Sequence, residues 1–145
     1  CMGVAEGEPK EVGYYAILPK IEATIAQFKP GLIAIPGRHD LNQDHRHLWE
    51  LCQIALRPGV GSYPRPKIIE SIAPDVIGPG EANFGVVLTE KLKDRVLGAM
   101  VCYEDEMREP PHPRSLLNLE ARYRHYGAKF GYDFVEPYRL VRGID

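Results

Sequence analysis

The stretch "IAIPGRHDLNQDHRHLWELC", residues 33–52, decides which fold the chain can adopt. A short apolar run ends at Pro36 and Gly37, and a helical pattern begins soon afterwards. The eight residues from Arg38 to His45 carry an Arg, two His, two Asp and an Asn. Because a bounded apolar run is typical of a buried strand in a parallel sheet, the stretch predicts a strand, a polar loop and a helix in succession.

Strands and helices are predicted to alternate along the rest of the chain. Apolar spacing predicts helices near residues 17–28, 44–56, 92–107 and 116–126, and strands near 31–36, 67–74, 84–89 and 138–143. This alternation predicts one α/β domain over residues 1–145, with a Rossmann-like, mainly parallel sheet and flanking helices. Residues 1–13 are expected to be loose, and the strand at 31–36 is expected to be buried on both faces.

Helix ends are predicted from residues with special backbone or capping preferences. Pro19 suits the first turn of the first helix, because a first-turn N–H has no intrahelical partner. Ser115 is a plausible N-cap of the last helix, and Gly127 is expected at its C-cap. Met100, Tyr103 and Met107 recur at helical spacing and are expected in the core.

Composition narrows the classes of partner. The chain has 145 residues, of which 44% are hydrophobic, and its 18 basic and 20 acidic residues give a formal charge of −2. This balance gives no electrostatic reason to expect nucleic acid or an anionic membrane as a partner. Three Cys without CxxC spacing argue against a disulfide framework, and no apolar stretch is long enough to cross a bilayer. We therefore expect a cytoplasmic protein.

The Arg38–His45 loop follows a strand at the end where open α/β sheets bind ligands. His39 and His45 can ligate a metal, while Asp40 and Asp44 can ligate, orient a His or move protons. Asn42 and Arg38 can donate hydrogen bonds to an oxyanion or a substrate carbonyl. Alternatively, Asp44 only caps the helix that follows. The adjacent His39 and Asp40 also occur in HD-type phosphohydrolases, which need further His and Asp on helices, and this chain offers no good candidates for those.

Three segments, at residues 30–58, 92–115 and 126–143, together resemble the LmbE-like or PIG-L family of zinc-dependent de-N-acetylases. The first, "PGLIAIPGRHDLNQDHRHLWELCQIALRP", resembles the family's strand, its "D-x-H/N-x-DH" loop and a helix ending in "A-x-RP". The second is "LKDRVLGAMVCYEDEMREPPHPRS", and the third is "YGAKFGYDFVEPYRLVRG". The matching letters are Pro30, Leu32, Ile33, Asp40, Asn42, Asp44, His45, Arg46, Ala55, Arg57, Pro58, Cys102, Tyr103, Pro111, His112, Pro113, Arg114 and Ser115.

The resemblance implies a zinc ion held by three protein ligands and a water. Carried over, His45 is one ligand, Asp44 orients the site, and Asn42 stands where many members have a His that stabilises the oxyanion or protonates the leaving amine. Asn can donate a hydrogen bond but cannot supply a proton. The other two ligands and the general base belong to an "HPDD-E" motif that this chain lacks. The chain therefore resembles the C-terminal half of such an enzyme.

The resemblance implies an amide hydrolase that removes an N-acetyl group from an amino sugar or sugar conjugate. Arg38, His112 and Arg114 are candidates to hold hydroxyl or anionic groups of the substrate, or alternatively to form a salt-bridged connector. The expected partner is the N-terminal half of the same enzyme, a swapped copy or a homo-oligomer. A second hypothesis is a non-catalytic fragment that pairs with a partner chain, because a divided parallel sheet leaves apolar edges.

Overall fold

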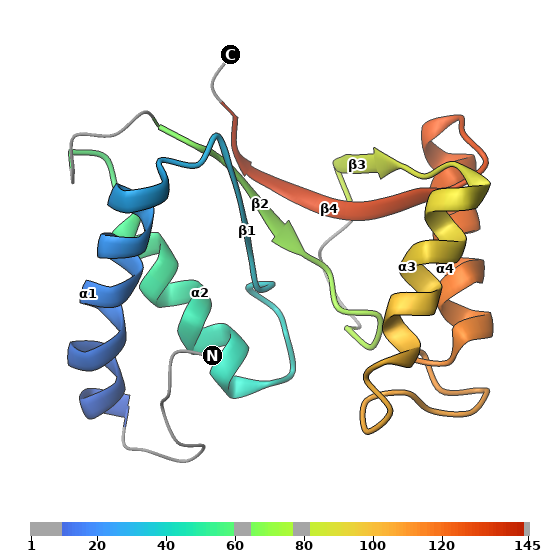
Figure 1. The fold of residues 1–145 in the computed structure, drawn as a ribbon, viewed down its shortest axis with the longest axis horizontal. Helices are drawn as coiled ribbons and strands as arrows, with labels where there is room; N and C mark the ends of the chain where they lie inside the picture. Colours follow the sequence, from blue (N-terminus) through green and yellow to red (C-terminus); the bar gives the residue numbers. More distant parts are fainter. Residues whose placement is uncertain (1–9, 60–64, 77–81, 144–145) are drawn as a thin grey trace.

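The computed structural model describes residues 10–59, 65–76 and 82–143, which form one four-stranded sheet with helices beside each half (Figure 1). The first half comprises α1 (Lys10–Phe28), β1 (Leu32–Ile35), α2 (Gln43–Ala55) and β2 (Lys67–Ser71). The second half comprises β3 (Phe84–Val87), α3 (Glu90–Val101), α4 (Leu116–Phe130) and β4 (Val135–Arg142). Among the described residues, no helix is long and apolar enough to span a membrane.

The strand order is β1-β2-β4-β3, with β1 and β2 parallel and the two pairings of β4 antiparallel. The α/β class is confirmed, but among the described strands most pairings are antiparallel, and the expected parallel pairing is found only between β1 and β2. The number of intervening helices explains the difference. One helix, α2, returns the chain for a second strand in the same direction, whereas two successive helices, α3 and α4, bring it back reversed.

Two apolar clusters fix the helices against the sheet. The larger one packs α1 and α2 on β1 and β2 through Ile21, Ile25, Ile35, Leu51, Cys52, Ala55, Leu56 and Ile68. Burial raises the pKa of the Cys52 thiol to about 11, so Cys52 acts as an apolar side chain rather than a nucleophile. The smaller cluster joins Leu88, Tyr123 and Phe134 beside α3 and α4.

β1 is an edge strand rather than a strand buried on both faces. Ile33 and Ile35 pack against the larger cluster, but Leu32 is 50% exposed. Within the described residues, β1 pairs only with β2. The apolar run therefore has one covered face and one uncovered edge, which is unusual for a strand of this composition.

Three helices differ from the sequence prediction at their ends. α1 begins at Lys10, so residues 10–13 are helical, and Pro19 lies inside the helix rather than in its first turn; residues 1–9 lie outside the described residues. α3 ends at Val101, and the Tyr103 side chain, expected in the core, is 65% exposed. In α4, Ser115 is the N-cap as predicted, but the C-cap is Gly131.

Gly127 is a packing residue of α4 rather than its cap. Gly131 adopts a left-handed conformation with φ 80°, which ends the helix, and its N–H bonds to the Gly127 carbonyl. At Gly127, a Cβ atom would lie 2.6 Å from the Tyr132 carbonyl oxygen and nearer still to that of Asp133. Only glycine lets the chain fold back this closely over the helix before entering β4.

We predict that Gly127→Ala lowers the free energy of unfolding by about 2 kcal/mol or more, because backbone atoms rather than flexible side chains block the added methyl group. Gly98→Ala is the matched control, since Gly98 lies within α3 and a Cβ there meets nothing within 4 Å. That control should raise stability by roughly 0.5–1 kcal/mol. Urea unfolding followed by circular dichroism measures both values, and equal effects of the two substitutions would contradict this account.

Candidate functional site

The Arg38–His45 loop lies at the carboxyl end of β1, beside the carboxyl end of the parallel strand β2. Gly37 marks the contact between the two, because a Cβ there would lie 2.6 Å from the Ser71 carbonyl oxygen. The close approach at Gly37 therefore sets where the loop starts relative to β2. Figure 1 shows the loop running from the end of β1 to the start of α2.

Asp40 organises this loop from a buried position. Only 8% of the residue is exposed. One carboxylate oxygen, Oδ1, accepts the Asn42 backbone N–H at 2.9 Å, and the other, Oδ2, lies 2.8 Å from Nδ1 of His45. Arg46 adds hydrogen bonds to the carbonyl oxygens of Asp40, at 2.6 Å, and Leu41, at 2.8 Å. The loop is thus held by polar contacts on both sides of Asp40.

The contact with Asp40 determines which nitrogen of His45 is available. A carboxylate can only accept, so the neutral imidazole carries its proton on Nδ1 and leaves the lone pair on Nε2. The His45 side chain is half exposed, so the ring reaches solvent. In metal-ligating His residues, the ring nitrogen that does not bind the metal usually donates its N–H to a group such as a carboxylate.

Asn42, and not Asp44, caps α2. The Asn42 side-chain oxygen accepts the Asp44 backbone N–H at 2.8 Å. Asp44 is exposed in the first turn of the helix, where a carboxylate interacts favourably with the helix dipole. The interpretation of Asp44 as the cap is therefore wrong, and the carboxylate that touches His45 belongs to Asp40. Because its amide oxygen is committed to the cap, Asn42 offers its NH₂ group to other partners.

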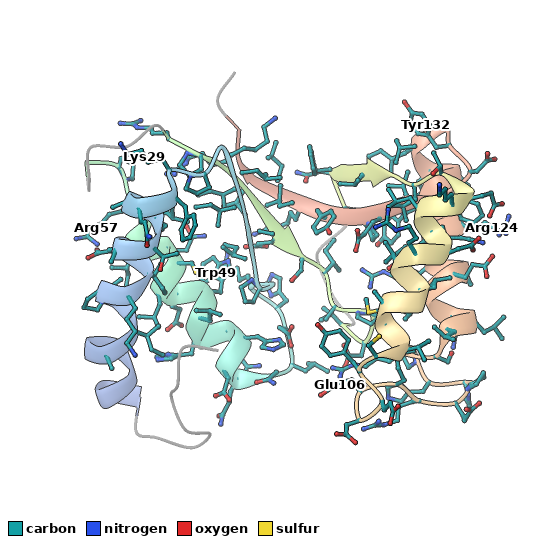
Figure 2. All side chains as sticks on the ribbon, in the orientation of Figure 1. Lys29, Trp49, Arg57, Glu106, Arg124 and Tyr132 are labelled. Carbon is teal, nitrogen blue, oxygen red and sulfur yellow. The ribbon has the colours of Figure 1, made fainter. Side chains whose placement is uncertain are left out.

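Arg38 belongs to a network that sequence analysis missed. Its guanidinium carbon lies 5.6 Å from the centre of the Trp49 ring. Trp49 extends from α2 towards the sheet (Figure 2), and its indole N–H donates to Glu70 of β2. Glu70 is 3% exposed and also accepts two hydrogen bonds from Arg139 of β4, at 2.7 and 3.2 Å. The only signal in the sequence was a charged residue within the apolar strand "KIIES".

His112 and Arg114 lie in the connector before α4 and contact mainly that connector. The Arg114 guanidinium pairs with Glu106 and, at 3.4 Å, with Asp75, while its backbone N–H donates to Nδ1 of His112 at 3.1 Å. Asn118 donates to the carbonyl oxygens of His112 and Pro111, both at 3.0 Å. These contacts favour the salt-bridged connector over a substrate-binding role for both residues.

The fit of a zinc ion to this region rests on His45. In residues 10–59, 65–76 and 82–143, no group of three or more His, Cys, Asp or Glu is arranged to hold a metal ion. His45 has the free Nε2, the solvent access and the carboxylate support expected of one ligand. The zinc ion therefore stays a prediction.

Comparisons with known proteins support the fold. No protein-family model and no curated protein matches the sequence. A solved structure does match, that of the conserved protein TT1542 from Thermus thermophilus, with a TM-score of 0.70 and 18% sequence identity. The match covers 99% of this chain and 63% of that protein, so the chain spans less than two thirds of the length of TT1542. At this identity the likeness shows the fold alone.

We predict that Asp40 sets the tautomer of His45. In the wild-type protein, nitrogen-15 NMR at a pH where His45 is neutral should show a protonated Nδ1 and an unprotonated Nε2. Asp40→Asn should shift His45 towards the Nε2–H tautomer, because the amide no longer offers a charged acceptor to Nδ1–H. Asp44→Asn should leave the tautomer unchanged, since among the described residues the ring is paired with Asp40 and not with the Asp44 carboxylate. An unaltered spectrum in Asp40→Asn would contradict the assigned role.

Proposed function

We propose that this chain supplies one wall of a zinc-dependent hydrolase of the LmbE-like or PIG-L type, which removes an N-acetyl or other acyl group from an amino sugar or sugar conjugate. The observation that carries the proposal is the 2.8 Å contact between Asp40 Oδ2 and His45 Nδ1, which leaves the Nε2 lone pair of a half-exposed ring available as a ligand. The parallel β1–α2–β2 unit is consistent with the Rossmann-like fold of that family.

Each residue of the loop has a distinct role in this proposal. Asp40 orients His45 and increases its basicity as a ligand. Asn42 holds the start of α2 with its amide oxygen and can donate its NH₂ to a developing oxyanion. Asp44 adds an exposed negative charge next to the ligand, and Arg38, placed over Trp49, can bind substrate hydroxyl groups. A zinc ion would supply an activated water and polarise the acyl carbonyl.

The proposal requires a second wall with two further ligands and a general base. A catalytic zinc site has about three protein ligands and one open position. We infer that an N-terminal half, or a swapped copy, carries these groups. Two observations support this inference: the match covers only 63% of TT1542, and among the described residues β1 pairs on one side only, with Leu32 and Phe28 exposed. The same edge also suits the alternative, a non-catalytic fragment that only pairs with a partner.

We predict that His45→Ala in the completed protein abolishes stoichiometric zinc and deacetylation of an N-acetylglucosaminide together. His39→Ala is the matched control, because His39 is exposed on the same loop and should leave the zinc content unchanged. Zinc is measured by mass spectrometry of the metal and activity by amine release. Tight zinc binding retained by His45→Ala would refute the ligand assignment.

We predict that Asp44→Asn lowers the deacetylation rate of the completed protein by at least about tenfold, because it removes the negative charge that the proposal places next to the ligand. The stability of α2 should change little, because Asn42 is the cap and Asn keeps the size of the Asp44 side chain. Steady-state rates and urea unfolding separate the two effects. An unchanged rate would leave Asp44 with no part in the reaction.

We predict that residues 1–145 alone form neither a competent zinc site nor a monomer. One ligand binds zinc weakly, and the apolar edge of β1 favours association. Mass in solution, zinc content and deacetylation should be compared before and after addition of an N-terminal half bearing the "HPDD-E" motif. A monomer that binds one zinc and turns over substrate would refute the divided site. Association without zinc or activity, even after the addition, would favour the non-catalytic alternative.

A further inference from the structure

A pocket of about 440 Å³ lies between the residues that follow β2, the connector before α4, and α4 itself, and its described lining includes no residue of the Arg38–His45 loop. Its apolar wall comes from Ile72, Pro74 and Val76 on one side and from Pro111 and Pro113 on the other. Side chains of α4 form its third wall. This volume is in the range of pockets that bind small molecules.

Arg122 of α4 places a cation in this pocket. One of its NH₂ groups donates to the Ile72 carbonyl at 2.5 Å, and its guanidinium carbon lies 5.8 Å from the centre of the Tyr126 ring. Both contacts hold the planar group in one orientation. Arg122 therefore lies fixed against the residues that follow β2.

Arg122 differs from neighbouring arginines in lacking a carboxylate partner. Arg114, Arg124 and Arg139 each form an ion pair with a Glu. In the part of the chain that the structure describes, Arg122 forms none, although it is half-buried. Burial lowers the pKa of its guanidinium, while Tyr126, Tyr123, Glu136 and Asp75 have smaller effects in the opposite direction. A partly desolvated guanidinium that forms no direct ion pair costs free energy that a bound anion would offset.

Polar groups around Arg122 complete the site. His125 lines the pocket, with its ring edge-on to Tyr126 at 5.3 Å between centroids. Asn118 lines it as well and holds the connector through the Pro111 and His112 carbonyl oxygens. The pocket thus combines a fixed guanidinium and an imidazole with an apolar wall, a pattern suited to an anionic group on an apolar or ring-shaped body.

We propose that this pocket binds the oxyanion group, a carboxylate or a phosphate ester, of a small organic molecule, with Arg122 as its anchor. Arg122 retains N–H groups beyond the one committed to Ile72, and a guanidinium matches either oxyanion in a paired hydrogen-bond geometry. The inference does not depend on the zinc site. It adds a ligand-binding function to the carboxyl end of β2.

Three small molecules that each contain a phenyl ring test the proposal: the anions benzoate and phenyl phosphate, and the neutral benzyl alcohol. Titrations of the nitrogen-15-labelled protein should show saturable shifts for residues 72–76 and α4 with at least one anion. Benzyl alcohol should bind at least about tenfold more weakly, as expected for loss of a charge-assisted hydrogen bond. Binding of benzoate alone identifies a carboxylate site, and binding of phenyl phosphate alone identifies a phosphate-ester site.

Variants separate Arg122 from general charge effects. Arg122→Gln should weaken anion binding by at least about tenfold, whereas Arg124→Gln, an exposed change on the same helix, should leave it unchanged. His45→Ala should also bind the anion normally, which distinguishes this site from the proposed zinc site. Because Arg122 also donates to Ile72, the Arg122 Nε–H resonance of the wild-type protein provides a readout that needs no variant. Absence of anion binding at millimolar concentration, or full affinity in Arg122→Gln, would overturn the proposal.

Discussion

The buried carboxylate of Asp40 is the group on which the candidate site depends. It accepts the Asn42 N–H and the His45 Nδ1–H, so it fixes the loop backbone and the imidazole together. Asn42, held in this way, then caps α2. Strand end, loop and helix start are therefore linked through one side chain, and a buried carboxylate is stable here because both of its oxygens have partners.

Local sequence patterns predicted the positions of helices and strands better than the relative directions of the strands in the sheet. The strand at Leu32–Ile35, the helix that follows the loop and the cap at Ser115 were all predictable from bounded apolar runs and capping residues. The direction of β4 depends on a property of the whole chain, namely that two helices rather than one separate it from β3. The sequence showed the Pro-rich break between those helices, but the alternating pattern by itself suggested a parallel sheet.

The site was predicted as a set of residues and not as a set of contacts. Asp40 and Asp44 are both close to His45 in sequence, and spacing could not decide which carboxylate faces its ring. The structure decides, because Asp44 continues into the helix, whereas Asp40 lies in the loop and can turn back towards the imidazole. The role of Glu70 was not predicted, because its hydrogen-bond partners are 21 and 69 residues away in the sequence, and local sequence patterns do not reveal contacts at such separations.

Because β1 and β2 are parallel, their carboxyl ends lie at the same end of the sheet, and each is followed by one of the two candidate sites. The loop after β1 carries a half-exposed imidazole whose Nε2 has no hydrogen-bond partner among the described residues, and the residues after β2 form one wall of the Arg122 pocket. Gly37 joins them, since its backbone lies against Ser71, the residue just before Ile72. Glu70, one residue earlier in β2, is hydrogen-bonded to Trp49 in α2 and to Arg139 in β4.

A ligand that rigidified residues 72–76 would therefore act on a segment continuous with the strand that supports the His45 loop. Coupling between the two sites would pass through β2 and through the contact between Gly37 and Ser71, a physical connection that needs no large movement of the helices.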